Sequence, residues 1–304
     1  MSKPFVAVAG ATGQLGRVIA TNLRQRNVSV KAIVRPGTAP SRTEALRSAG
    51  VIVAEADLSD VAALTKSMQG ATCVVSALNG LQDTMHGTQG ALLDAAVAAS
   101  VPRFIPSDFS LDFTKTQPGS NRNLDLRREF HARLDGSGIS WTSVLNGGFM
   151  DLLAGDAPLV NDRLRRVLYW GSDAQPLNFT TVADTAAYTA AVAADSNPTP
   201  RFLRIAGDTF SAKELAEIVG RVRGTGYSTL WVGGTGFLEG ASNFMRRFSI
   251  GGGEQDIFPA WQGMQYMVNM FSGEGRLDPL DNARYPELKW TTAEEFLAQQ
   301  QASK

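Results

Sequence analysis

The chain has 304 residues, 43% hydrophobic and 19% charged, and its 29 Lys and Arg balance its 29 Asp and Glu. This length suffices for one large or two modest domains, and the balanced charge argues against nucleic-acid or membrane-surface binding, which needs a basic excess. A single cysteine, Cys73, excludes an intrachain disulfide, and only two histidines, His86 and His131, exclude a His-rich metal site, so we expect no metal.

The first half of the chain alternates between strand and helix patterns. Short apolar runs predict strands at residues 5–9, 28–34, 51–54, 72–76, 103–106 and 140–145. Helical spacing and capping residues predict helices at 14–26, from Ser41 (with Glu44 three residues on), from Asp60, at 88–100 and at 123–136. Strands that are apolar on both faces and separated by helices predict a parallel sheet covered on both sides.

The second half has a different pattern. We predict strands at residues 167–170, 178–181 and 202–205 and helices at 184–194 and 211–222. The sequence therefore predicts one domain over residues 1–146 and a smaller α+β domain over residues 147–304. Segments near 178–206 are expected to rejoin the first domain.

Aromatic residues and methionines gather after residue 236. Three of them, together with one valine, have the helical spacing i, i+3, i+4, i+7, which favours a core-facing stripe but also suits a lid over an apolar ligand: Met264, Met267, Val268 and Phe271. Further candidates to line such a ligand site are Trp170, Phe237, Phe258 and Trp261.

A glycine-rich turn between the first strand and the first helix is the strongest functional signal. In a dinucleotide site the first glycine permits the tight turn, the second lets the backbone approach a pyrophosphate, and the third lets the helix pack closely on the sheet. The helix N-terminus then offers N–H groups to the anion. The spacing and context predict a Rossmann-type doubly wound α/β domain that binds a dinucleotide through Gly10, Ala11, Thr12, Gly13, Gln14, Leu15 and Gly16.

The end of the second strand indicates which dinucleotide binds. An NAD site has an acidic residue there to hold the ribose 2′-OH, whereas an arginine suits a 2′-phosphate. The sequence has Val34-Arg35-Pro36 and no acid, so Arg35 is a candidate phosphate ligand and NADP(H) the expected cofactor.

Two further strand ends are candidate cofactor contacts. Asp57 and Leu58 follow the third strand. An adenine contact and a turn that leads into the next helix explain them equally well. Ala77 and Leu78 follow the fourth strand, where the cofactor ribose is expected. Cys73, inside that strand, is interpreted as a small buried hydrophobic residue and not a nucleophile.

Four stretches of this chain resemble the NmrA-like, isoflavone reductase-like branch of the short-chain dehydrogenase/reductase superfamily. They are Gly10–Gly16, residues 34–37, residues 103–109 (Arg-Phe-Ile-Pro-Ser-Asp-Phe) and residues 283–297 (Ala-Arg-Tyr-Pro-Glu-Leu-Lys-Trp-Thr-Thr-Ala-Glu-Glu-Phe-Leu). The resemblance covers nearly the whole length. It implies an NADP-binding Rossmann domain, a C-terminal substrate domain and, for the reductase members, an aromatic, phenylpropanoid-like substrate.

The resemblance also implies nicotinamide contacts. The family's Pro-Ser-Glu-Phe-Gly segment is similar to residues 106–110 here, with Asp108 in place of Glu, which puts Ser107 and Phe109 beside the nicotinamide. The segment after the sixth strand adds Asn146 and Phe149. Packing in the hydrophobic core is the alternative interpretation for both Phe109 and Phe149.

The family's catalytic lysine falls on Arg127, and no lysine occurs between residues 121 and 138. An arginine is a poor proton donor but can stabilise an oxyanion as a fixed positive charge. His131, one helical turn further, is able to exchange protons near neutral pH. For both residues a polar helix face is the competing interpretation, and it is favoured for His131.

We therefore expect an NADPH-dependent reductase of a small apolar, aromatic carbonyl or conjugated substrate. The alternatives are an NADP(H)-sensing NmrA-like regulator without turnover, and a lyase or isomerase that uses bound NADP structurally.

Met1 is followed closely by a strand pattern, with no long apolar core of a signal peptide and no stretch near the ~18 apolar residues of a membrane span. A cytoplasmic monomer or homodimer that binds no membrane is expected.

Overall fold

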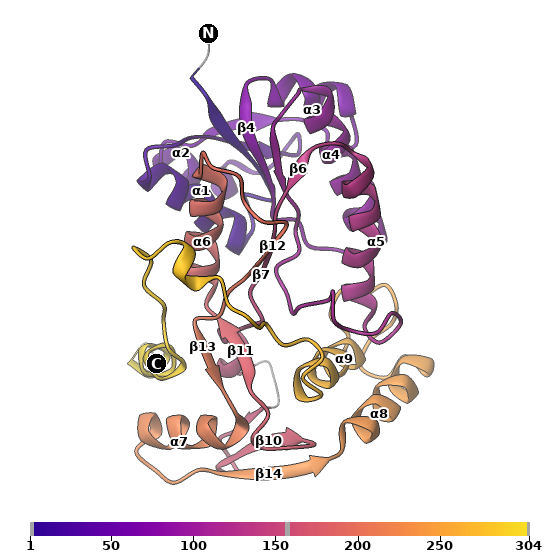
Figure 1. Ribbon diagram of the computed structural model, residues 1–304, viewed down its shortest axis with the longest axis vertical. Helices are drawn as coiled ribbons and strands as arrows, with labels where there is room; N and C mark the ends of the chain where they lie inside the picture. Colours follow the sequence, from indigo (N-terminus) through magenta and orange to yellow (C-terminus); the bar gives the residue numbers. More distant parts are fainter. Residues whose placement is uncertain (1–2, 156–158, 303–304) are drawn as a thin grey trace. The chain divides into compact units, whose positions relative to one another are not determined.

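A computed structural model describes residues 3–155 and 159–302 (Figure 1). These residues form two compact units. Unit 1 comprises the chain up to Phe109, Leu126–Val144 and Thr185–Leu203, and unit 2 comprises Ser110–Asp125, Leu145–Asp184 and the chain from Arg204 on. Sequence reasoning placed residues 110–125 in the first domain. They belong to unit 2 because they bond to it, for example through the Asp112 N–H, which donates to the Gly275 carbonyl at 3.0 Å.

Six strands of unit 1 form one parallel sheet. Its strand order is β3-β2-β1-β4-β5-β6, and the register places Val8 opposite Ala32 in β2 and Val75 in β4. The strand bounds are β1 Phe5–Ala9, β2 Ser29–Val34, β3 Ile52–Glu55, β4 Ala71–Ser76, β5 Arg103–Ile105 and β6 Ser140–Trp141. This order confirms the predicted Rossmann-type fold, whose ligands bind at the carboxyl ends of the strands near the β1–β4 switch point.

Helices cover both faces of this sheet. Figure 1 shows α1, α2 and α6 on one side and α3, α4 and α5 on the other. The bounds are α1 Gln14–Gln25, α2 Pro40–Ser48, α3 Val61–Met68, the π-helical turn η1 Asp83–Thr88, α4 Gln89–Ala98, α5 Arg122–Gly136 and α6 Val182–Ala194. Apolar side chains of β1, β4 and β5 pack against α3, α4 and α5, with Phe104 and Phe130 fully buried among them.

Two helix starts test the capping predictions. Asp60 caps α3 as predicted, because its carboxylate accepts from the Ala62 and Ala63 N–H groups at 2.9 and 3.0 Å. The predicted start at Ser41 is wrong. Helix α2 begins at Pro40, whose fixed φ and missing N–H suit the first helical position, and its N-cap residue Ala39 has no side-chain cap.

The predicted strand 140–145 is two strands that change partner at Thr142. The Thr142 N–H donates to the Phe104 carbonyl at 3.0 Å, whereas the Ser143 N–H donates to the Arg201 carbonyl at 2.7 Å. Accordingly β6 pairs with β5, and β7 (Ser143–Leu145) pairs with β12 (Phe202–Arg204).

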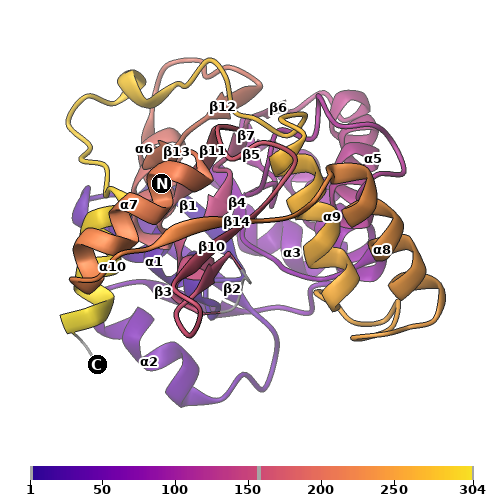
Figure 2. The ribbon, with the colours of Figure 1, turned by 90° about the horizontal axis from the view of Figure 1, so that it is seen from below.

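The described residues of unit 2 form small mixed sheets and further helices. One sheet has the order β14-β10-β9 and another β13-β11-β8. The bounds are β8 Gly148–Phe149, η2 Met150–Ala154, β9 Val160–Asn161, β10 Arg166–Trp170, β11 Leu177–Thr180, β13 Asp208–Phe210, α7 Ala212–Arg223, β14 Ser228–Gly233, α8 Thr235–Arg247, α9 Ala260–Phe271, η3 Asn282–Arg284 and α10 Ala293–Ala302. Figure 2 shows α8 beside α9 and α10 beside α7.

The predicted methionine stripe lies on α9. Phe271 is a member of the apolar core of unit 2, and the half-buried Met264, Met267 and Val268 pack against that core. The core-facing interpretation of the stripe is therefore confirmed. Within residues 3–155 and 159–302, no helix is both long and apolar enough to cross a membrane.

Candidate cofactor site and its surroundings

The turn after β1 requires glycine at two positions for packing reasons. Gly10 has φ +80°, and a Cβ there would lie 2.4 Å from the Ala77 carbonyl oxygen. A Cβ on Gly16 would lie 2.3 Å from the Gly10 carbonyl oxygen. The Gly13 N–H closes the turn by donating to the Gly10 carbonyl at 2.9 Å. The backbone of β1, β4 and α1 is thus brought together as closely as the predicted dinucleotide turn requires.

The start of α1 is suited to binding an anion. Gly13 is its N-cap residue, with no side-chain cap among the described residues and no acidic residue in the first helical turn. Gly13 and Gln14 are exposed, whereas Thr12 and Leu15 are half-buried. The first N–H groups of a helix need a partner, and a phosphate satisfies them while interacting favourably with the helix dipole. The residues at this turn therefore fit the diphosphate of a dinucleotide.

Arg35 lies directly after β2 and is exposed. Its carbonyl accepts from the Thr38 N–H at 3.2 Å and the Thr38 hydroxyl at 2.6 Å, which fixes the turn backbone. Among the described residues its guanidinium has no hydrogen-bonding or ionic partner. A side chain without an internal role at this strand end is available for a 2′-phosphate, and no acidic residue competes for the position.

Asp57 has a structural role in the turn after β3. It is exposed, and its carboxylate accepts from the Ser59 N–H at 2.9 Å and from the Ser59 hydroxyl at 2.7 Å. These hydrogen bonds lower the pKa of Asp57. Leu58 packs against the core of unit 1. Asp57 therefore stabilises the turn before α3. An adenine contact by Asp57 or Leu58 stays a prediction.

The ends of β4 and β5 are linked through Ser107. Its hydroxyl donates to the Leu78 carbonyl at 2.6 Å, and its N–H donates to the Gln89 side-chain oxygen at 2.9 Å. Ala77 continues the sheet, because its N–H donates to the Ala9 carbonyl at 2.9 Å. Sequence reasoning missed Gln89, which is fully buried on α4. A single amide on a helix with few polar residues was the only available signal.

Asp108 and His131 form a buried pair in unit 1. The Nε2 of His131 lies 2.7 Å from the Asp108 carboxylate, and their residues are 8% and 0% exposed. The ring of His131 stacks on Phe202 and contacts Trp141. Arg127 lies one helical turn earlier on α5 and is also buried. Asp108 was missed as a site residue although its motif was recognised.

Phe109 follows Asp108 and is buried at 7% exposure. The other two predicted nicotinamide contacts belong to unit 2. Asn146 is buried, and its N–H donates to the Ser110 carbonyl at 3.0 Å. Phe149 is half-buried in β8, which pairs with β11. Roles of Phe109, Asn146 and Phe149 in cofactor binding stay predictions.

Cys73 is fully buried in β4. Burial raises the pKa of its thiol to about 12, so the reactive thiolate is scarcely populated at neutral pH. The interpretation of Cys73 as a small buried hydrophobic residue is confirmed.

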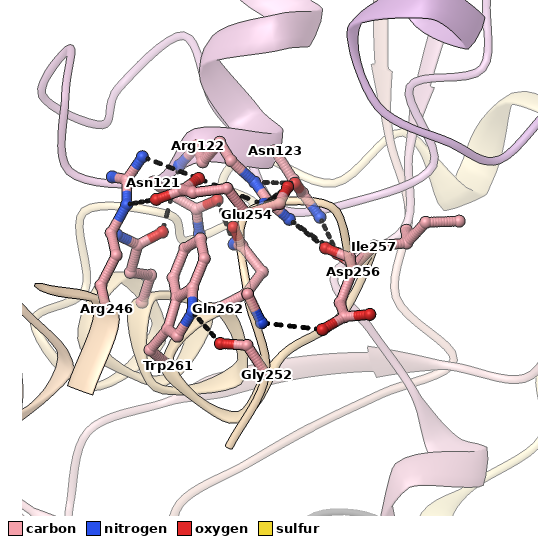
Figure 3. Close-up of polar contacts among 12 residues, drawn as sticks. Asn121, Arg122, Asn123, Arg246, Gly252, Glu254, Asp256, Ile257, Trp261 and Gln262 are labelled. Carbon is pink, nitrogen blue, oxygen red and sulfur yellow. Dashed lines mark hydrogen bonds and ion pairs between the residues drawn. The ribbon is translucent and has the colours of Figure 1, made fainter. Parts of the chain in front are cut away.

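In unit 2 the residues that begin α5 bind the segment between α8 and α9 (Figure 3). The guanidinium of Arg122 donates to the Asp256 and Ile257 carbonyls at 2.9 and 3.0 Å. Trp261 lies between two guanidinium groups, with Arg122 4.6 Å and Arg246 4.8 Å from its ring centre.

Glu254 completes what we call the Trp261 cluster, namely Arg122, Arg246, Glu254 and Trp261. Its carboxylate lies 2.6 Å from the Arg246 guanidinium and 3.5 Å from that of Arg122. Trp261 and Trp170 are buried, whereas Phe237 and Phe258 are 67% and 60% exposed. Of the four residues suggested to line an apolar ligand site, only these last two present large apolar surface.

Comparisons with known proteins assign the family. The NmrA-like family matches residues 2–297, so this chain belongs to it, as the sequence motifs predicted. Isoflavone reductase homolog IRL of Zea mays is 26% identical, with 97% of each chain covered. Quinone oxidoreductase 2 of Escherichia coli (strain K12) is 30% identical, over 67% of this chain and 69% of that protein.

The fold agrees with this assignment. A solved structure of AtPrR2 with NADP+ and (+)pinoresinol has a TM-score of 0.82 to this chain, at 21% identity over 98% of this chain and 99% of that one. At this identity the likeness concerns the Rossmann-type sheet and the small mixed sheets.

Proposed function

We propose that this protein is an NADPH-dependent reductase of a small apolar, aromatic carbonyl or conjugated substrate. The observation that carries the proposal is the start of α1, where a glycine turn and a helix without a side-chain cap leave backbone N–H groups for a diphosphate. Arg35, in the position of the NAD-specific acid, supports NADP(H) over NAD(H).

The cofactor would be held at the carboxyl ends of several strands in unit 1. Gly10–Gly16 would bind the diphosphate and Arg35 the 2′-phosphate, while Ala77 and Leu78 would border the ribose. Ser107 is fixed by Gln89 and by the Leu78 carbonyl, so its place beside that strand end is well defined. Asp57 and Leu58 would approach the adenine.

When bound, the reduced nicotinamide supplies a hydride. The chain then has to position the substrate and stabilise the negative charge that develops on its oxygen. We assign the second task to the permanently charged Arg127. An arginine does not give up its proton, so the proton comes from water or from His131.

The substrate class rests on the relatives and on unit 2. Isoflavone, pinoresinol and quinone are aromatic or conjugated molecules, and they appear in the names of the similar proteins and structures. Unit 2 exposes aromatic side chains, Phe237 and Phe258, of the kind that bind flat apolar rings.

The test is oxidation of NADPH, followed at 340 nm, with a panel of aromatic aldehydes, enones and quinones. Turnover of at least one member with NADPH, and much slower turnover with NADH, is expected. Product formed without net oxidation of NADPH would indicate a lyase or isomerase instead.

The second candidate is an NADP(H)-sensing regulator without turnover. The observation that favours it is Arg127, because the resemblance places a lysine there and an arginine cannot act as the acid. Tight NADPH binding together with no turnover across the whole panel would support this function.

A further inference from the structure

A side-chain hydrogen bond connects His131 to the segment that follows β5. Its Nε2 lies 2.7 Å from the Asp108 carboxylate, which is fully buried. A carboxylate accepts hydrogen bonds, so we assign the Nε2–H of His131 as the donor of this one. Hydrogen bonds to charged groups are among the stronger ones in proteins, so this bond resists rearrangement.

Aromatic neighbours hold the imidazole ring in this orientation. Phe202 stacks on it with ring centres 5.4 Å apart and planes 29° apart, and Trp141 contacts it at 4.7 Å. Phe202 in turn meets Trp141 edge-on at 5.4 Å. Rotating the ring to present Nε2–H elsewhere would break the bond to Asp108 and disrupt this packing.

Asp108 lies between the two residues expected at the nicotinamide, Ser107 and Phe109. Ser107 is held from α4, by Gln89. Asp108 is held from α5, by His131. Residues 107–109 are therefore fastened by two helices at the carboxyl end of β5, the edge of the sheet where ligands of this fold bind.

We propose that His131 is a positioning residue that holds residues 107–109 for the nicotinamide end of the cofactor, and not the proton donor of the reaction. This inference rests on the proposed NADPH-dependent function. It leaves water as the source of the proton.

The test compares two amides that differ in reach. His131→Gln places its side-chain nitrogen near the position of Nε2 and can still donate to Asp108, whereas His131→Asn is one methylene shorter and cannot. His131→Phe, which keeps the ring but has no donor, replaces His131→Asn if that variant proves unstable. Dissociation constants are measured for NADPH and for 2′,5′-ADP, which lacks the nicotinamide, together with kcat.

We expect His131→Asn to weaken NADPH about tenfold and to leave 2′,5′-ADP within about twofold of wild type. His131→Gln should retain NADPH affinity and most of kcat. If both variants lost kcat equally while binding NADPH normally, His131 would be the proton donor and the proposal would be wrong. Unchanged NADPH affinity and kcat in His131→Asn would equally overturn it.

Hydrogen exchange supplies a readout that needs no cofactor. The amides of residues 107–109 should exchange faster in His131→Asn than in wild type, and at the wild-type rate in His131→Gln. Equal exchange in all three proteins would overturn the positioning role. If wild type bound neither NADPH nor 2′,5′-ADP, the proposed function would fail, and hydrogen exchange would still decide whether His131 fastens this segment.

Discussion

At the scale of single residues, the three glycines of the first turn are needed for different reasons. Gly10 and Gly16 are required by the fold, because a Cβ at either would lie within 2.4 Å of a backbone oxygen. Gly13 has an ordinary φ of −83°, and its closest neighbour would be 3.3 Å from a Cβ. The absence of a side chain at position 13 is therefore better explained by close approach of a ligand than by packing of the chain.

Arg35 decides cofactor choice in our proposal. Replacing it with Asp should weaken NADPH binding by about 10- to 100-fold, because a charge-assisted bond to the 2′-phosphate is lost and a repulsive charge is added. NADH affinity should change little. Fluorescence titration with both cofactors measures this, with the exposed Arg163→Asp in unit 2 as the control of equal charge change. Equal weakening of NADPH and NADH would contradict a 2′-phosphate contact.

Arg127 is the residue on which turnover depends in the proposal. Arg127→Ala should lower kcat about 100-fold and leave the dissociation constant of NADPH nearly unchanged, because the charge acts on the developing oxyanion. Arg127→Lys, which keeps a positive charge, should retain more activity. Arg133→Ala, on the exposed side of the same helix, is the control. An Arg127→Ala enzyme with wild-type kcat would remove this residue from the reaction.

At the scale of elements, some helix boundaries follow from local sequence and others do not. Ser211 and Glu214 form a reciprocal capping box at the start of α7, and Gly224 ends that helix in the left-handed conformation. Both signals are local, and the predicted helix 211–222 is confirmed. The similar pair Ser41 and Glu44 forms no cap, because Pro40 already begins α2.

The Trp261 cluster holds the segment between α8 and α9, and its stability should depend on pH. Hydrogen bonding and charge from Arg246 lower the pKa of Glu254 below its ordinary value of 4.5. A lowered pKa in the folded state means that the stabilisation is complete above the unfolded pKa and is lost as pH falls through the folded pKa.

We therefore expect Glu254→Gln to reduce the melting temperature at pH 7 by about 2 °C or less, since the pair is half exposed. The difference from wild type should shrink below pH 4.5 and vanish at more acid pH. Glu274→Gln, at another exposed glutamate, is the control. A difference that persists or grows as the pH falls would contradict this role of Glu254. Thermal unfolding between pH 3 and 7 makes the comparison.

At the scale of the whole molecule, cofactor binding should stabilise the folded chain. A ligand at 100 times its dissociation constant adds about 2.7 kcal/mol to the free energy of unfolding. NADPH should therefore raise the melting temperature, and hydrogen exchange should slow at Gly10–Gly16 and at residues 76–78. The amides of α7, in unit 2, provide the internal comparison. Stabilisation without slower exchange at the glycine turn would place the ligand elsewhere.

The sequence by itself determined the class of fold, the glycine turn after the first strand and the family, because these depend on contiguous signals. A strand, three spaced glycines and the start of a helix lie within twelve residues of Phe5, and strand–helix periodicity repeats through the first half. Arg35 could also be identified as a candidate from the sequence, since it directly follows a predicted strand.

Only the tertiary structure decided which side chains meet. Gln89 reaches the Ser107 N–H, and His131 reaches Asp108 across 23 residues of chain. Arg122 joins a segment more than 130 residues away. Neither periodicity nor capping encodes such pairs, because their geometry arises when separate strands and helices pack. The same packing moved Ser110–Asp125 out of the unit in which its neighbours in sequence fold.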